Sequence, residues 1–444
     1  MKTSKLLIKC CTSCALVLAL WFPCSVTAQQ AGPEQSSGQS DTPAVEQSDR
    51  SRSGHDQLPS LGGPDGVSQQ LKKAEAQVSI LPQPSWLKPY DDWKKRIKDE
   101  YGLSFGLSAY WLYQNASESL SDKDDAFGGI YRFQGSWVAF AKDTGHPGRL
   151  EWRVEKRTDI GSNLSPAQLS SEIGAAALNT GFGYNHNFST DLAVLNWTQA
   201  FNNQRAGIAA GRLAFDVYLD AFMFQTFSRG FINRAFLLNP TLATTGIGAL
   251  GAVAKGFVTD NFWLGGQIYD GNAASGKFDF NTFEEHEWLK AVEIGWTPSI
   301  SRYKTDRIQF TYWGKDERQK AGATEGSGWV ASASYRLTDR FIPFTRFGHS
   351  DGGAGVAAES AASVGFEFTP RKDQAWSLGA GWAKPSEKTF GTGLKDEYVF
   401  ETSYKFQVWP FLSLTPDLQL LLDPAKNPAE SSVWLFGLRA ILTL

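Results

Sequence analysis

The residue types that usually carry catalysis form no recognisable set in this sequence. Five histidines are present, none at the spacing of a metal site: His55, His146, His186, His286 and His349. Residues 246–251 fit the pattern G-x-G-x-x-G, but a dinucleotide site needs it at a strand-to-helix turn, and no helical pattern follows. Asp122, Asp124 and Asp125 could hold calcium, although solvated carboxylates are the simpler interpretation. We therefore expect no catalytic residues, no metal and no cofactor.

Charged side chains alternate with apolar ones shortly after residue 148. Four of them fall at every second position: Glu151, Arg153, Glu155 and Arg157. An extended strand directs such residues to one face. Carboxylates accept and guanidinium groups donate hydrogen bonds, so the set could bind the hydroxyl groups of a polar solute. We hypothesise that these residues line a water-filled space as a charged ladder.

A second group of arginines, together with phenylalanines, lies in a long insertion at 214–251. It includes Phe227, Arg229, Phe231 and Arg234. Phenylalanines are poorly placed against water, so we predict that this loop folds into a wide lumen and narrows it. The alternative is a loop that packs as an external or lateral cover. A second insertion, 158–189, is also too long for a turn, and loops of this length in a compact domain are usually functional.

Composition limits the elements that can hold these residues. The chain has 444 residues, 42% of them hydrophobic, 13% aromatic and 20% charged, with a net charge of −3. Mean hydropathy is −0.30. After the N-terminus no apolar run approaches the length of about 18 residues that a membrane helix needs, which argues against a helical membrane protein. The nearly balanced charge argues against a nucleic-acid partner.

The first 85 residues differ in composition from the rest. Residues 1–28 combine early lysines, an apolar stretch and a small-residue site ending at Ala28, which predicts a cleaved signal peptide. All four cysteines lie within it, at Cys10, Cys11, Cys14 and Cys24. Lipidation at Cys24 is the weaker alternative. Residues 29–85 are rich in Gln, Ser, Gly and Pro, and we predict a disordered linker with a possible short helix near 69–78.

Aromatic residues fall at helical spacing over 86–101. Trp86, Tyr90, Trp93 and Tyr101 share one face, which predicts a short amphipathic helix in the periplasm. We favour a helix packed on the rest of the domain over one that lies on a membrane surface.

From residue 102 to residue 444 the hydrophobic period changes to two. Strands are predicted near 102–114, 128–141, 148–157, 190–199, 205–213, 252–258, 262–270, 286–297, 306–314, 327–336, 341–349, 360–368, 375–383, 396–408, 411–422 and 431–444. Their polar face is repeatedly charged and their apolar face tends to end in aromatics, as in the girdles of outer-membrane barrels. We therefore predict an all-β fold, an antiparallel transmembrane barrel of about 16 strands, rather than a soluble sandwich.

The C-terminal sequence resembles the OprB-type carbohydrate-selective porins. The resemblance is carried by residues 404–419, which include TPDLQ, by the DP and NP pairs within 423–428, and by VWLFGLR at 433–439. Gly211 and Arg212, before the long loop, match more weakly. Acidic residues expected directly after Arg212 are displaced to Asp216 and Asp220, and the helix start reads Asp-Asp-Trp-Lys-Lys in place of Gly-Asp-Trp-Gly-Gly.

This resemblance covers about residues 86–444. It implies a barrel of a Gram-negative outer membrane, in contact with its lipid, that passes mono- and oligosaccharides by diffusion. It also implies inward loops and a constriction lined by arginines and aromatics, with Arg212 on the wall. A general or differently selective porin, an export channel for a polysaccharide or another secreted product, and a barrel enzyme are the alternatives. A homotrimer and a monomer both stay open.

Overall fold

The computed structural model describes residues 62–444, except 143, 162–163, 186–187 and 276–280. The predicted signal peptide and residues 29–61 of the predicted linker lie outside the described residues, so both stay predictions. Among the described residues, no helix is long and apolar enough to cross a membrane.

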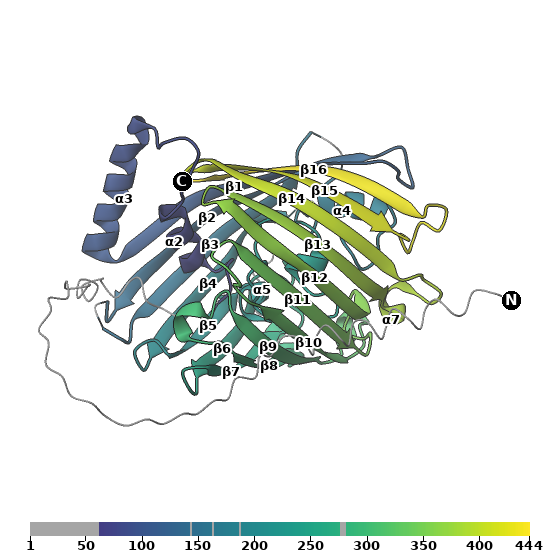
Figure 1. The fold of residues 1–444 in the computed structure, drawn as a ribbon. Coiled ribbons are helices and arrows are strands. Elements are labelled where there is room, and N and C mark those ends of the chain that lie inside the picture. The colour runs from purple at the N-terminus through teal and green to yellow at the C-terminus, as the bar shows by residue number, and fades with distance from the viewer. Residues whose placement is uncertain (1–61, 143, 162–163, 186–187, 276–280) are drawn as a thin grey trace, which may run out of the picture. The chain divides into compact units, whose positions relative to one another are not determined.

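The described chain is dominated by one closed antiparallel barrel (Figure 1). Its strands are β1 (Leu103–Ala116), β2 (Asp125–Phe140), β3 (Gly148–Asp159), β4 (Phe188–Phe201), β5 (Ala206–Leu213), β6 (Ala249–Phe257), β7 (Phe262–Asp270), β8 (Trp288–Trp296), β9 (Arg307–Lys315), β10 (Gly326–Ser334), β11 (Phe341–Ser350), β12 (Ala358–Arg371), β13 (Gln374–Pro385), β14 (Glu397–Trp409), β15 (Leu412–Leu422) and β16 (Ser432–Thr443). Each strand pairs with the next, and β1 pairs with β16 to close the barrel. The predicted fold class is confirmed.

Side chains alternate between the two faces of the barrel. Polar residues point inward and apolar residues point outward, the reverse of the arrangement in a soluble protein. On β14, Glu397 and Glu401 point inward and are buried, whereas Tyr398 and Phe400 point outward and are 42% and 49% exposed. Large exposed apolar residues recur in this register around the barrel, for example Leu107, Val292 and Phe436. An apolar outer face suits lipid, and closure leaves no unpaired strand edge.

Short helices accompany the strands. They are α2 (Val67–Glu75), α3 (Lys88–Tyr101), α4 (Pro166–Glu172), α5 (Phe215–Tyr218), α6 (Arg234–Leu237) and α7 (Glu387–Phe390), with 3-10 turns η2 (Ser85–Leu87), η3 (Asn281–Glu285), η4 (Ile300–Arg302) and η5 (Gln319–Ala321). The connections from β2 to β3, β4 to β5 and so on form one end of the barrel, here called the short-turn end. Both long insertions start from the opposite end.

Helix α3 confirms the helix predicted at 86–101, and it lies at the short-turn end (Figure 1). Trp93 packs edge-on against Phe105 of β1, with ring centroids 5.4 Å apart. Even so, Trp93 and Tyr101 are 42% and 65% exposed, and no residue of α3 is buried. The helix therefore contacts the barrel through only part of its aromatic face.

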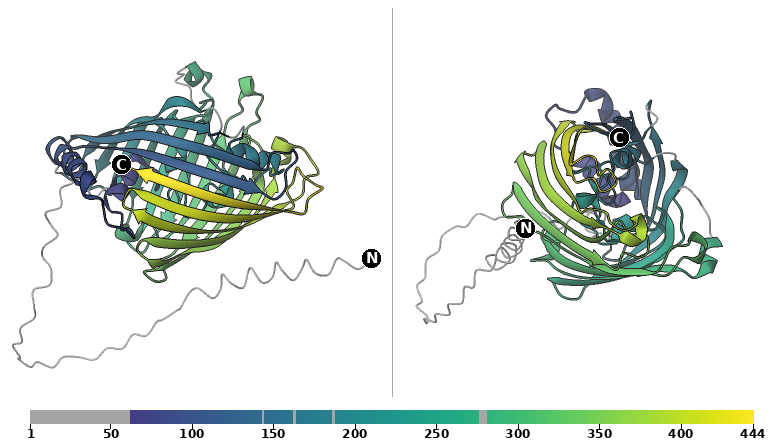
Figure 2. Two further views of the ribbon diagram at one scale, coloured as in Figure 1. Left: turned by 90° about the horizontal axis from the view of Figure 1, so that it is seen from above. Right: turned by 90° about the vertical axis from the view of Figure 1, so that its right-hand side faces the viewer.

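Helix α2 lies inside the barrel near the short-turn end (Figure 2). Residues 62–75 contact both the wall and the loop between β5 and β6: Gly63 N donates to Val217 O at 2.6 Å, and Ser68 Oγ lies 3.2 Å from Ser136 Oγ of β2. The sequence predicted a linker with a possible short helix here. It did not predict this placement, because nothing in a Gly- and Ser-rich composition identifies a distant partner.

Candidate functional site

Inward side chains hold the first long insertion inside the barrel, and Glu397 makes several of these contacts. Glu397 of β14 accepts backbone hydrogen bonds from Ala176, Ala177 and Leu178 at 2.6, 2.8 and 2.9 Å. Helix α4 precedes this segment and starts with a capping box formed by Ser165 and Gln168. Buried N–H groups need such an acceptor, so Glu397 fixes the path of the insertion.

The second insertion, residues 214–248, is here called the constriction loop. Asp220 forms a buried ion pair with Arg346 of β11 and accepts from Gln309 of β9 at 2.7 Å. On the other side, Glu401 of β14 accepts from the backbone of Asn233 at 3.0 Å, and Arg439 of β16 donates to the carbonyl of Phe231 at 3.1 Å. Inward residues from well-separated strands thus hold the loop, which folds into the barrel and is not an external cover.

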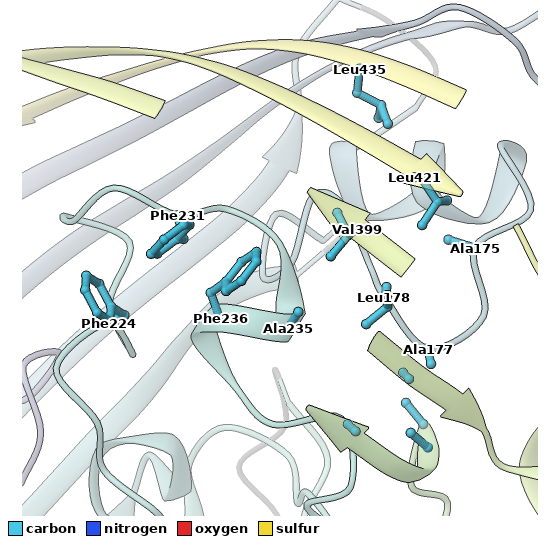
Figure 3. Packing of buried hydrophobic residues seen from close by; sticks show 14 of the residues in the cluster. Ala175, Ala177, Leu178, Phe224, Phe231, Ala235, Phe236, Val399, Leu421 and Leu435 are labelled. Carbon is cyan, nitrogen blue, oxygen red and sulfur yellow. The ribbon is translucent and has the colours of Figure 1, made fainter. Parts of the chain in front are cut away.

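An apolar cluster supports the constriction loop on one side. Phe224, Phe231 and Phe236 of the loop pack together and against the wall, with residues of the first insertion nearby (Figure 3). Phe231 and Phe236 stack with centroids 4.4 Å apart, and Phe231 meets Phe344 of β11 edge-on at 5.6 Å. Phe231, predicted as a lumen-lining residue, is fully buried in this cluster.

Phe227 lies in a different environment, facing the arginines of β2 and β3. The guanidinium carbons of Arg132 and Arg157 lie 5.3 and 5.7 Å from its ring centroid. Tyr110 and Tyr184 meet the same ring edge-on, at 6.2 and 5.7 Å. The structure therefore brings predicted residues Phe227 and Arg157 together, in an arginine and aromatic cluster that also contains Arg132.

The other two predicted loop arginines point elsewhere. Arg229 forms a bidentate ion pair with Glu367 of β12, at 2.8 and 2.6 Å, and keeps 24% of its side chain exposed. Arg234 begins α6, and its guanidinium lies 5.6 Å from the ring of Phe182. Burial lowers the pKa of Arg234 to about 10.

The four predicted ladder residues point inward from β3 and are buried, as the alternation predicted. Glu155 accepts from Arg132 Nε at 2.6 Å and from Arg157 Nε at 2.7 Å. Arg153 donates to Gln134 at 3.0 Å, and Glu151 accepts from Ser68 of α2. The ladder is therefore closely hydrogen-bonded.

Arg212, also predicted as a lumen residue, lies at the end of β5. It forms a bidentate ion pair with Asp191 of β4, at 2.9 and 2.8 Å, and its side chain is 7% exposed. It thus joins neighbouring strands of the wall.

Several inward residues were not predicted to belong to the site. Arg132, Arg346 and Arg439 occupy the inward register of their strands, so alternation could have identified them. Asp65 forms ion pairs with Arg132 and Arg153, at 3.0 and 3.3 Å, from a segment with no sequence signal for such a role.

Two small openings lie beside α2. One is lined by Ser68, Glu75, Ser104 and Arg149 among others. The second lies between α2, strands β3 to β5 and the constriction loop.

A buried aspartate in the constriction loop makes the protein sensitive to pH. Burial raises the pKa of Asp216 to about 6 from an ordinary value of 3.8, and the negative charge of Asp65 adds to the shift. Arg132, Arg153 and Arg157 oppose it. The folded state thus binds this proton more tightly, so the contribution of Asp216 to stability is largest below pH 4 and is lost as the pH rises through about 6, by up to ~3 kcal/mol.

We expect Asp216→Asn to remove the contribution of Asp216 and so to reduce the slope of stability against pH. Thermal unfolding of the detergent-solubilised protein, followed by circular dichroism between pH 4 and pH 7, measures it. Asp122→Asn, at an exposed loop position, is the control and should keep the wild-type slope. Equal slopes for wild type and Asp216→Asn would contradict the assignment.

One further motif fits a catalytic pattern. Residues 348–352 read G-x-S-x-G, but a nucleophile elbow needs an exposed serine at a strand-to-helix turn. Here β11 ends at Ser350 and the chain returns through a loop to β12. Ser350 is 2% exposed and its hydroxyl donates to Ala358 O at 2.8 Å. The serine has a structural partner and no elbow geometry.

A closed barrel with an apolar outer face and a polar interior narrowed by its own loops defines a porin of a Gram-negative outer membrane. Known proteins agree with this class. Residues 167–444 match the family described as "Carbohydrate-selective porin, OprB family", and the chain belongs to this family. Fold and family point to a channel, not an enzyme.

The individual relatives and the solved structure share low sequence identity with this chain. The chain is 22% identical to porin AaxA of Chlamydia felis (strain Fe/C-56), over 78% of each chain. It is 25% identical to porin AaxA of Chlamydia pneumoniae, over 82% of this chain and 78% of the relative. The solved high-pH structure of Pseudomonas putida OprB has a TM-score of 0.63 at 13% identity and covers 80% of this chain and 97% of that one, which shows a shared fold.

Proposed function

We propose that the barrel passes mono- and oligosaccharides by passive diffusion through a lumen lined by arginine, acidic and aromatic side chains. One observation supports this most directly: the ring of Phe227 lies beside two guanidinium groups, those of Arg132 and Arg157. An aromatic face accepts the C–H face of a sugar ring, and guanidinium groups bind its hydroxyls.

The charged side chains of the lumen would replace hydrogen bonds that the sugar makes to water. A sugar that enters the lumen loses bound water, and charged side chains can replace the lost hydrogen bonds. These side chains are Glu151, Arg153, Glu155 and Arg157 on β3, Arg229 on the opposite side of the lumen, and Arg212 nearer the end from which the long insertions start. Each contact is shared with a protein partner, so binding stays weak at every position. Weak binding at several sites lets the solute leave as well as enter.

Liposome swelling with sugars of increasing size tests this proposal. We expect fast swelling for monosaccharides and slower swelling for larger oligosaccharides. Ion current without block by sugar would favour a general porin. If the protein gives no swelling and no current, it is a closed exporter or an enzyme, and the proposal is overturned.

Loss of a lining arginine should alter the pore. Arg153→Ala and Arg229→Ala are each expected to change single-channel conductance or sugar block at least about two-fold, because each removes a fixed charge beside the path. Planar-bilayer recordings measure this. Arg371→Ala is the matched control, since Arg371 lies at the β12–β13 turn with 65% of its side chain exposed. Unchanged currents in both lumen variants would refute the assignment.

A further inference from the structure

Residues 62–75 occupy the space between the constriction loop and the charged wall. Gln70 Nε2 donates to Thr226 of the loop at 3.1 Å, and Lys73 Nζ donates to Ser228 Oγ at 2.9 Å. Ser68, on the other side, contacts Ser136 and Glu151 of the wall. A segment from outside the barrel sequence thus fills a position that would otherwise be open to solute.

The carboxylate of Asp65 is the centre of this contact. Its Oδ1 accepts from Arg132 Nη1 at 3.0 Å, and its Oδ2 accepts from Arg153 Nη1 at 3.3 Å. The side chain of Asp65 is 5% exposed, that of Arg132 is 1% exposed and that of Arg153 is 2% exposed. Gln70 Nε2 and Thr226 Oγ1 lie 3.3 and 3.4 Å from the same Oδ1. Gln70 belongs to the same segment as Asp65, whereas the two guanidinium groups and the Thr226 hydroxyl belong to the wall and the constriction loop, and such groups recognise a carboxylate.

The two arginines of the wall depend on Asp65 to different degrees. Arg132 keeps Glu155 as a second ion-pair partner. Arg153 has Asp65 as its ion-pair partner among the described residues, and its other side-chain partner, Gln134, is neutral. Withdrawal of Asp65 would leave the buried guanidinium of Arg153 without a direct ion-pair partner, which is unfavourable. Another anion would relieve this cost.

The segment is held mainly by polar contacts. Its buried apolar side chains are Val67 and Leu71. The rest of its attachment is the Asp65 site and hydrogen bonds. A tethered segment of this kind competes with free solutes through an effective concentration in the millimolar range, of order 1 mM or more. A soluble carboxylate must therefore reach at least this concentration range to compete with Asp65 for the two arginines.

We propose that Arg132 and Arg153 form a carboxylate-binding site in the lumen, that Asp65 occupies it as an intramolecular ligand, and that a sugar carboxylate binds there when residues 62–75 withdraw. This inference rests on the proposed function and names acidic sugars as a substrate class. Residues 62–75 are then a displaceable plug.

Block of ion current in planar bilayers by glucuronate and by glucose tests the site in the full-length protein. These probes differ in a carboxylate that replaces a hydroxymethyl group. We expect Asp65→Asn to strengthen glucuronate block at least 10-fold and to leave glucose block nearly unchanged. Asp260→Asn, whose carboxylate is 77% exposed at a turn, is the matched control and should behave as wild type. Equal glucuronate block in wild type and Asp65→Asn would overturn the proposal.

A second variant tests the plug even if the Asp65→Asn protein fails to fold. Ser68→Cys/Ser136→Cys should form a disulfide between α2 and β2, because the two hydroxyl oxygens lie 3.2 Å apart and the native cysteines all precede residue 25. Oxidation should abolish glucuronate block and lower the conductance, and reduction should restore both. Full block of the current by glucuronate in the oxidised protein would show that residues 62–75 are not a displaceable plug.

The outcomes separate this inference from the proposed function. Swelling by neutral sugars with no preference for glucuronate would overturn the carboxylate site and leave sugar diffusion standing. Glucuronate block that depends on Asp65, without swelling by neutral sugars, would support the site and overturn diffusion of neutral sugars. Acetate serves as a third probe: equal block by acetate and glucuronate supports a carboxylate site but overturns its restriction to sugars.

Discussion

Asp220→Ala is expected to release part of the constriction loop and to raise single-channel conductance several-fold. The substitution leaves Arg346 fully buried on β11 without its carboxylate, and removing one partner of a buried ion pair costs about 3–5 kcal/mol. It also deprives Gln309 Nε2 and Thr311 Oγ1 of an acceptor, at 2.7 and 3.3 Å. The barrel itself keeps its strand pairing, so the change should appear in the loop. Bilayer conductance and proteolysis of the loop both measure it.

The double variant Asp220→Ala/Arg346→Met provides the control. Replacing both charges with apolar groups is often nearly neutral, because no unpaired charge is left. We therefore expect the double variant to recover most of the docking lost in the single variant. If the single variant conducts like wild type, the pair does not hold the loop.

Glu397→Ala is expected to have the second large effect, on the first insertion. The wild-type carboxylate accepts from three consecutive backbone N–H groups at Ala176, Ala177 and Leu178, and also from Ala425 N at 3.0 Å. Each buried donor left without a partner costs about 1–3 kcal/mol. The insertion between β3 and β4 should detach locally. Hydrogen exchange of residues 164–185 should increase by at least about 100-fold.

Two further variants define the cause. Glu397→Gln keeps one acceptor oxygen and should show an intermediate increase, whereas Glu118→Ala, at an exposed loop position, should show none. Exchange that stays at the wild-type rate in Glu397→Ala would show that the apolar contacts of Leu178 and its neighbours suffice.

Both predictions reflect how a porin interior differs from a soluble core. The outward side chains point away from the loops inside the barrel and therefore do not hold them. The inward face of the strands is polar, so the loops are fixed mostly by charged groups that meet backbone atoms, such as Glu401 with Asn233 and Arg439 with Phe231. Apolar packing supports them in a cluster around Phe224, Phe236 and Phe344 and in a second one that joins Leu219 and Leu238 to the wall.

The strands and their faces could be predicted from the sequence because their signal is local. A period of two in polarity needs only neighbouring residues, and it placed Glu151 to Arg157 on the inward face of β3 correctly. The same local reasoning identified helix α3 and the two insertions. It could not distinguish Phe227, beside the arginines, from Phe231, in the apolar cluster, because both lie on one irregular loop.

The sequence by itself thus determined the barrel and the alternation of inward and outward residues along its strands. Only the tertiary structure decided which charges meet: Asp65 with Arg153, 88 residues apart, Asp220 with Arg346, 126 apart, and Arg229 with Glu367, 138 apart. The physical reason is that alternation is a property of each strand, whereas ion pairs across a lumen depend on closure of the barrel and on the path of the loops inside it. For Asp65 no local pattern exists at all, and its role follows from position alone.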